Sequence, residues 1–323
     1  MEQLLGVGAA LVDLVGEVDD AWVAAQNDGK GGMTLVDWPR MKSMLDSFPN
    51  PQRVPGGSAC NTMRGLARLG AHAAFLGKVG ADDLGKVFLD SLTSNGVQSR
   101  LLTGSIPTGR VLSAVTPDAQ RSMFTYLGAS SETTPADLQD QSFLGASHIY
   151  LEGYIAYNAP WFKAVVELAH KLQIPLILDF GSFNVIQDCR PLLDWALRET
   201  HFAALIANED EAKAFTGLEG EAALRQMIPL AETVVVKLGR AGALLAHGSE
   251  IVRVPAIAVE AVDTTGAGDL WASGFLYGIL QGKSLEFAGN LASRVASEVV
   301  QVMGPMIPPE GWERILGSQE YRL

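Results

Sequence analysis

The chain has 323 residues, 48% hydrophobic and 19% charged, and a formal net charge of −12. This composition predicts a soluble globular protein that is large enough for one large domain or two smaller ones. The acidic balance, with no basic run, argues against a nucleic-acid or anionic membrane surface. Only two cysteines occur, Cys60 and Cys189, which favours a reducing cytoplasm over a disulfide framework or cysteine-ligated zinc.

The N-terminal stretch MEQLLGVGAALVDLVGEVDD lacks a basic region and carries acids within its apolar part. It is interpreted as a strand of the mature protein and not as a signal peptide. No stretch approaches the ~18 apolar residues needed to span a bilayer, and the five histidines form no ligand cluster. A cytoplasmic protein is therefore expected.

Short apolar runs alternate with helical patterns along most of the chain. The segment 55–97 predicts a helix–strand–helix unit, and the later apolar runs lie at 148–155, 174–180, 202–208 and 233–239. Continuous apolar strands alternating with helices predict a doubly wound α/β fold, with a mostly parallel sheet and helices on both faces.

Two segments break this alternation, residues 11–52 and 108–127. The second contains two strand-like runs around Pro117-Asp118, which indicates a hairpin. We expect both segments to pair as a small antiparallel sheet that acts as a lid. The α/β body would then comprise residues 1–10, 53–107 and 128–323.

The stretch VDTTGAGDLW (262–271) places Gly266, Ala267 and Gly268 before an acid and an apolar helical pattern. Backbone N–H groups at a helix N-terminus lack intrahelical partners and favour anions. An acid at such a site, Asp269, has a use if it takes a proton from a group that attacks the bound anion. The alternative is a glycine-rich turn with Asp269 as an N-cap.

A second glycine-rich stretch, PGGSACNT (55–62), also precedes a helical pattern. Gly56 and Gly57 allow close approach of a ligand to the backbone, and Asn61 offers both a donor and an acceptor. Glu152 ends the apolar run HIYLEG, at the sheet edge where open α/β sheets bind ligands. The alternatives are a turn with an N-cap for the first motif and a loop cap for Glu152.

Together these motifs resemble a known family. GGSACNTMRGLARLG with KVGADDLGKVF resembles the N-terminal signature of the pfkB (ribokinase-like) carbohydrate kinases, and DTTGAGDLWASGF resembles their C-terminal signature. NEDE (208–211) is similar to the family's Asn-x-x-Glu motif, and KLGRAG (237–242) is similar to its nucleotide-binding turn. Four motifs in the family's order cover nearly the whole chain. The resemblance implies an ATP-dependent kinase that phosphorylates a small sugar or nucleoside.

The resemblance also implies residue roles at the acceptor. Asp269 would be the general base that deprotonates a substrate hydroxymethyl group, and the amides of residues 266–268 would stabilise the developing charge. Asp13, at the end of the first strand, would bind a sugar diol, with Gly56, Gly57, Asn61 and Glu152 completing the acceptor site. The alternative for Asp13 is a solvated acid at a strand end.

For the nucleotide, the resemblance assigns Mg²⁺ and phosphate contacts to Asn208 and Glu211, through water. The remaining residues expected at ATP are Lys237, Gly239, Gly242, Arg121 and Asn290, the last at the start of a late helix. Asn208 as an exposed helix cap, Lys237 as a strand-end cation and Arg121 as an exposed hairpin arginine are the alternatives.

Three further stretches, KGGMTLVDWPRM, VTPDAQRSMFTYLGAS and IYLEGYI, resemble the adenosine-kinase-like bacterial branch. That branch commonly has asparagine four residues before the diol-binding aspartate, where this chain has Ala9. An adenosine-like ribofuranoside is favoured, and ribose, fructose and other nucleosides stay open. The protein is expected to be a monomer or a homodimer through the lid.

Many members of this family bind a monovalent cation beside the anion site. Asp263 and Thr265 fit the start of such a site, but Val302 replaces the arginine of the ribokinase pattern, which argues against potassium dependence.

Two other functions are considered. A non-catalytic ligand-binding protein on the kinase fold would be indicated by loss of Asp269 or of Gly266-Ala267-Gly268, and all are present. A dinucleotide oxidoreductase would need G-x-G-x-x-G directly after the first strand, whereas GVGAALVD has its glycines before the strand ends.

Overall fold

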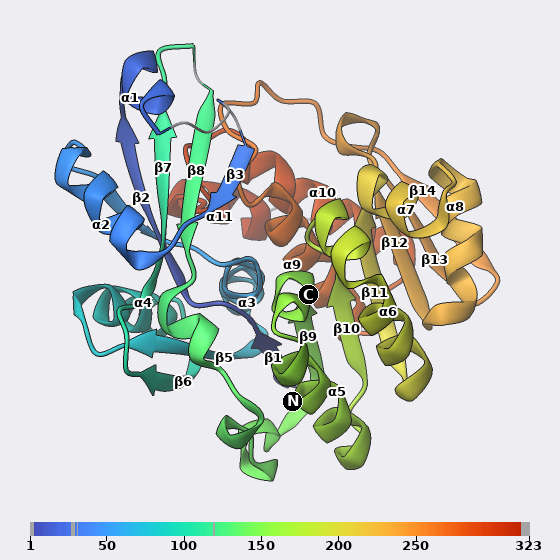
Figure 1. The fold of residues 1–323 in the computed structure, drawn as a ribbon. Coiled ribbons are helices and arrows are strands. Elements are labelled where there is room, and N and C mark those ends of the chain that lie inside the picture. Colours follow the sequence, from blue (N-terminus) through green and yellow to red (C-terminus); the bar gives the residue numbers. More distant parts are fainter. Residues whose placement is uncertain (1–2, 27–29, 31, 119, 318–323) are drawn as a thin grey trace.

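A nine-stranded sheet forms the centre of the molecule (Figure 1). The computed structural model describes residues 3–26, 30, 32–118 and 120–317. In spatial order the strands are β14 (Glu250–Val254), β13 (Ala243–His247), β12 (Thr233–Lys237), β11 (Phe202–Asn208), β10 (Leu176–Asp179), β9 (Ala146–Glu152), β1 (Gln3–Val7), β5 (His72–Gly80) and β6 (Gln98–Gly104). The strands from β12 to β6 pair in parallel, and β13 and β14 form an antiparallel edge.

Helices cover both faces of this sheet. The α-helices of the body are α3 (Ser58–Arg68), α4 (Asp83–Ser94), α5 (Ala159–Leu172), α6 (Phe183–Glu199), α7 (Glu209–Thr216), α8 (Gly220–Met227), α9 (Ala267–Leu280), α10 (Leu285–Val299) and α11 (Pro309–Gly317). Short 3-10 turns lie at Gly128–Glu132, Pro135–Asp137, Asp140–Phe143, Gly153–Tyr157, Ile228–Leu230 and Gly239–Ala241. Among the described residues, no helix is both long and apolar enough to cross a membrane.

Alternation within the buried strands creates two cores. In β1, Leu4 joins the cluster formed with α3, α9 and α10, whereas Leu5 and Val7 join the cluster formed with α5 and α6. Successive side chains of a strand point to opposite faces, so an apolar run is buried on both sides. The doubly wound α/β fold predicted from the apolar runs is confirmed.

A second, five-stranded sheet rises from one side of the body (Figure 1). Its strands in spatial order are β3 (Gly32–Leu35), β8 (Arg121–Tyr126), β7 (Gly109–Val115), β2 (Leu11–Glu17) and β4 (Gln52–Pro55). The predicted hairpin is confirmed, because β7 and β8 pair antiparallel. The sheet as a whole is mixed and not antiparallel, because β2 pairs with β7, and β3 with β8, in parallel.

Two short helices, α1 (Asp20–Ala24) and α2 (Trp38–Ser47), cover one face of the small sheet. Val23 of α1 and Met41 of α2 pack in one cluster with Leu112, Phe124 and other residues of β7 and β8. The opposite face carries Asp13. Residues 27–29, 31 and 119 of the two predicted lid segments lie outside the described residues.

The expectation that Asp13 ends the first strand is wrong. Strand β1 ends at Val7, the chain crosses between the sheets at residues 8–10, and Asp13 lies within β2 of the small sheet. Both pieces have strand-like composition, and periodicity does not indicate that a chain changes sheets. Asn290 also differs from its prediction, since it lies inside α10 and not at its start.

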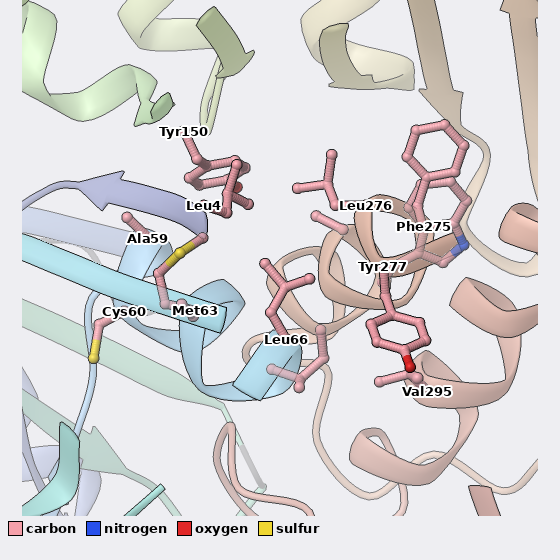
Figure 2. Packing of buried hydrophobic residues seen from close by; sticks show 14 of the residues in the cluster. Leu4, Ala59, Cys60, Met63, Leu66, Tyr150, Phe275, Leu276, Tyr277 and Val295 are labelled. Atoms are coloured by element: carbon pink, nitrogen blue, oxygen red, sulfur yellow. The ribbon is translucent and has the colours of Figure 1, made fainter. Parts of the chain in front are cut away.

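Helix α9 packs closely against its neighbours. In Figure 2, Phe275, Leu276 and Tyr277 of α9 lie in one cluster with Leu66 of α3 and Val295 of α10. The approach to α10 depends on Gly274, where an added Cβ would lie 2.8 Å from the Cα of residue 292 in α10. No side chain can yield there, because the contact is with backbone.

We therefore expect Gly274→Ala to destabilise the protein by about 1–3 kcal/mol, the usual cost of overpacking a core. Chemical denaturation measures the change. Gly317→Ala, at the exposed end of α11 where an added Cβ meets no atom, is the matched control and should be neutral or slightly stabilising. Equal stability of Gly274→Ala and wild type would contradict the close helix contact.

Candidate active site

Asp269 lies in the first turn of α9 and accepts hydrogen bonds from helix α3. Ser58 Oγ donates to its Oδ1 at 2.7 Å, and Asn61 Nδ2 donates to its Oδ2 at 2.8 Å. Both donors come from the N-terminal turns of α3. The alternative that Asp269 is an N-cap is wrong, because the N-cap residue of α9 is Gly266, with φ of 74°.

The start of α9 has the form of an anion site. Gly266 provides no side chain to cap the helix, so the first N–H groups are not satisfied by a capping side chain. The Lys237 Nζ lies 3.3 Å from the position that a Cβ on Gly268 would occupy. A helix N-terminus and a lysine ammonium thus place positive charge together.

Burial raises the pKa of Asp269 to about 6, although the hydrogen bonds from Asn61 and Ser58 oppose the rise. The carboxylate is therefore ionised at neutral pH, because neutral pH lies about one unit above its pKa. A proton acceptor of this kind is matched to work near pH 7.

Lys237 connects two strands, β12 and β10, at the carboxyl edge of the sheet. It ends β12, and its Nζ donates at 3.0 Å to Asp179 Oδ2 at the end of β10. Burial opposes the charge on Lys237, but attraction from Asp179 and Glu211 raises its pKa above the ordinary value. Asp179 was not identified from the sequence, although it follows a short apolar run at the edge where ligands bind.

Asn208 and Glu211 form a capping box at the start of α7. Asn208 Oδ1 accepts from the N–H of Glu211 at 2.9 Å, and Glu211 Oε2 accepts from the N–H of Asn208 at 2.7 Å. The cap that was weighed as an alternative for Asn208 is present. Burial raises the pKa of Glu211, with repulsion from Asp179 adding to the effect.

Asn208 and Glu211 could take part in a Mg²⁺ site but could not form one by themselves. Carboxylate and amide oxygens are ligands that Mg²⁺ accepts, and the ion keeps several waters. Glu211 Oε1 also accepts from the Asn208 amide at 2.8 Å, so both of its carboxylate oxygens already have protein donors. The described residues contain no group of three or more His, Cys, Asp or Glu side chains that could hold a metal. Phosphate oxygens would have to complete such a site.

The turn between β12 and β13 contains the two predicted nucleotide-site glycines. Gly239 and Gly242 have φ of 51° and 94°, a region that favours glycine. An added Cβ on Gly239 would lie 3.9 Å from the Glu209 carboxylate of α7. The turn after β12 and the capping box after β11 therefore lie side by side, because β11 and β12 are neighbouring strands.

Asp13 lies on the small sheet, close to the first glycine-rich turn. Its Oδ2 is 2.7 Å from the position of a Cβ on Gly56. Burial raises the pKa of Asp13 to about 6, whereas Arg121 and Arg64 lower it. The next residue, Gly57, has φ of 89° and precedes α3, and a Cβ there would lie 2.5 Å from a main-chain oxygen of residue 9. Glycines are therefore required at both positions.

Arg121 of β8 joins the small sheet to the body. Its Nη1 donates to Thr265 Oγ1 at 2.6 Å and its Nη2 donates to Asp263 Oδ2 at 3.0 Å. Asp263 also accepts from the N–H of Gly304 at 2.8 Å. The loop directly before the anion site is thus held by an arginine from the other sheet, and Arg121 is not an exposed hairpin residue.

Glu152 is buried beneath the chain crossing. Its Oε1 accepts from the N–H of Ala9 at 2.7 Å, and its Oε2 accepts from the N–H of Ala59 at 2.9 Å. Burial raises the pKa of Glu152 to about 7. Both carboxylate oxygens hold backbone, so this residue positions the crossing and the start of α3 in the present arrangement.

The arrangement therefore brings together most residues singled out in the sequence. Asp269, Lys237, Asn61 and the start of α9 converge at one point, with Arg121 at the preceding loop. Ser58 and Asp179 complete it and were missed. Ser58 lies within a motif already noted, whereas Asp179 had only its place at a strand end as a signal.

Comparison with known proteins identifies relatives along nearly the full length. The model of the pfkB family carbohydrate kinases matches residues 33–311. Ribokinase of Bacillus subtilis is 30% identical over 301 residues, which covers 92% of both chains. Adenosine kinase of Saccharomyces cerevisiae is 28% identical and aligns over 95% of this chain and 97% of its own.

Solved structures match equally well. A probable sugar kinase from Rhizobium etli has a TM-score of 0.87 at 33% identity and covers 97% of both chains. Adenosine kinase from Sinorhizobium meliloti has a TM-score of 0.86 at 32% identity, covering 97% of this chain and 98% of its own.

The raised pKa values of the buried and partly buried carboxyl groups predict how the stability of the protein depends on pH. Folding raises the pKa values of Asp13, Glu152, Asp269 and Glu211 above their ordinary values. The folded state therefore binds more protons than the unfolded state between about pH 4 and 7, so stability should increase as pH falls through this window. We expect a higher midpoint of thermal unfolding at pH 6 than at pH 8, measured at equal ionic strength.

Carboxyl groups with lowered pKa values, such as Asp82, Asp137 and Asp263, stay ionised throughout this range and should not mask the effect. A midpoint of thermal unfolding that is lower at pH 6 than at pH 8 would contradict the raised pKa values of Asp13, Glu152, Asp269 and Glu211.

Proposed function

We propose that this chain, which belongs to the pfkB family of carbohydrate kinases, transfers the γ-phosphate of ATP to the hydroxymethyl group of a nucleoside. As a family member it is a phosphotransferase with an alcohol group as acceptor. The observation that carries the proposed chemistry is the partly buried Asp269 carboxylate, which lies in the first turn of a helix whose N-terminus has no side-chain cap.

Asp269 removes the proton of the acceptor hydroxyl as its oxygen attacks the γ-phosphate. Phosphoryl transfer depends mainly on positioning and charge stabilisation. The amides of Gly266, Ala267 and Gly268 stabilise charge on the transferred group, and the ammonium of Lys237 adds to them. Because Asp269 must be ionised, activity is present above about pH 6 and is lost below it.

ATP lies along the carboxyl ends of β11 and β12, beside Gly239 and Gly242, with its phosphates toward α9. Asn208 and Glu211 would hold Mg²⁺ through water molecules, and the ion would neutralise charge on the phosphate oxygens.

The acceptor lies between the small sheet and the body. Asp13 accepts hydrogen bonds from the vicinal hydroxyls of a ribose, beside Gly56 and Gly57. Residues 11–52 and 108–127 act as a lid over it, which excludes water.

The surface beside Asp13 supports a nucleoside acceptor. By strand register, Val111 lies beside Asp13 on the same face of the small sheet, and Val15 and Met123 follow on that face, with Thr125 and Ser113 between them. The valine and methionine side chains offer apolar contact to a flat base, which a free sugar lacks.

A free-sugar kinase is the second candidate. The observation that favours it is Ala9, which has no polar side chain where adenosine-kinase-like chains commonly have asparagine. A non-catalytic protein is disfavoured because the base and the anion site are intact. The helices α1 and α2 over the outer face of the small sheet favour a monomer, since that face has no need of a partner.

A panel assay tests the acceptor. ATP consumption is measured with adenosine, other nucleosides, ribose, fructose and related sugars at matched concentrations. We expect the highest kcat/KM for a nucleoside. A free sugar that exceeds every nucleoside by tenfold would replace this proposal with the second candidate.

Asp269→Asn should lower kcat by about 10²–10⁴-fold, the usual contribution of a general base, because the amide cannot take the proton. Binding of ATP, measured by calorimetry, should stay close to that of wild type. Asp90→Asn, at an exposed position on α4, is the control and should keep full activity. A third of the wild-type kcat in Asp269→Asn would remove the residue from this role.

The ion pair at Asp263 predicts that the enzyme does not need potassium. The guanidinium of Arg121 already supplies positive charge to this carboxylate beside the anion site. We expect kcat in sodium or tetramethylammonium chloride to stay within twofold of kcat in potassium chloride. A tenfold activation by potassium would contradict this assignment.

A further inference from the structure

A buried arginine stands behind the residues that hold Asp269. Arg64 follows Asn61 by three residues on α3, and its side chain is 5% exposed. Its Nη1 donates to Ser91 Oγ at 3.0 Å, and its Nη2 donates to the main-chain oxygen of Pro55 at 2.8 Å and to Asn61 Oδ1. Each of these acceptors is uncharged.

Burying a guanidinium is costly unless nearby anions compensate for the lost water. The compensation comes from the site, since the charge on Arg64 acts on Asp13 and lowers its pKa. Hydrogen bonds from Arg64 to Asn61 and from Asn61 to Asp269 connect this charge to the base.

The direction of these hydrogen bonds follows from the groups involved. An arginine only donates, and an ionised carboxylate only accepts, so the amide between them has one orientation in which both ends are satisfied. Arg64 requires Oδ1 on its side, which leaves Nδ2 to face Asp269. Without Arg64, the amide of Asn61 can rotate by half a turn and present oxygen to the carboxyl group.

We infer that Arg64 is a positioning residue that fixes the Asn61 amide as a hydrogen-bond donor to Asp269. The inference rests on the proposed role of Asp269 as the base. A donor stabilises the ionised carboxylate, whereas an oxygen in its place stabilises the protonated form. Arg64 thus keeps the base in the form that can accept a proton at neutral pH.

The test is the pH dependence of kcat from pH 5 to 9 in Arg64→Met and Arg64→Lys, with the acceptor that performs best in the panel. We expect Arg64→Met to move the acid limb, the fall of kcat at low pH, upward by about one pH unit, with kcat lowered about twofold at pH 7 and close to tenfold at about pH 5. The KM for ATP should stay within twofold of wild type. Lysine also donates a charged hydrogen bond, so Arg64→Lys should return the limb to within about 0.3 units.

Arg68→Met is the matched control, because Arg68 lies on the same helix and contacts the ring of Trp312 instead. Its acid limb should not move. If Arg64→Met does not fold, Arg64→Gln takes its place. Glutamine can present its oxygen as well as its N–H to Asn61 and so does not fix the amide, and its limb should lie above that of Arg64→Lys.

An Arg64→Met enzyme with a lower kcat but an unmoved acid limb would overturn the inference and leave Arg64 a packing role. This outcome differs from failure of the proposed function. If Asp269→Asn stays active, the base is wrongly assigned and the inference falls with it. If Asp269→Asn is inactive and the limb of Arg64→Met is unmoved, the inference alone falls.

Discussion

The rest of the site depends on how the carboxylate of Asp269 is held beside the positive end of helix α9. Asp269 is partly buried, and Ser58 and Asn61 of α3 donate hydrogen bonds to it. The two helices must therefore stay in register. Packing of α9 against α3 and α10 provides this, and Glu152 holds the start of α3 through the N–H of Ala59. The packing of the core thus keeps Ser58 and Asn61 within hydrogen-bond distance of Asp269.

Charge balance explains how an acidic chain can bind a polyanion. The net charge is −12, but three cations from three elements face the acids of the site: Lys237 on β12, Arg121 on β8 and Arg64 on α3. Each is buried or nearly so, where local charge counts for more than the distant surface. The acids in turn keep these cations charged. Net charge alone therefore says little about the ligand.

Local patterns predicted what is local. The apolar runs gave the parallel strands, the pair of runs around Pro117 gave the hairpin, and the glycines before Asp269 gave the start of α9. The change of sheet at residues 8–10 was missed because both flanking strands look alike in sequence. Arg64 was missed because it reaches Asp269 only through Asn61. Asp179 was missed because its partner, Lys237, is 58 residues away in the sequence. Long-range hydrogen bonds leave no periodic signal.

The placement of Arg121 relates the two sheets. It belongs to the small sheet, with Asp13 on the same face, but its hydrogen bonds go to the loop that leads into the anion site. The small sheet, which carries the proposed acceptor ligand Asp13, therefore also sets the position of the loop that leads into α9. Displacing that sheet would remove the arginine from Asp263 and leave a partly buried acid without its cation, which is unfavourable. The ion pair between Arg121 and Asp263 thus favours the present arrangement of the two sheets, and an acceptor bound by Asp13, as proposed, would favour it further.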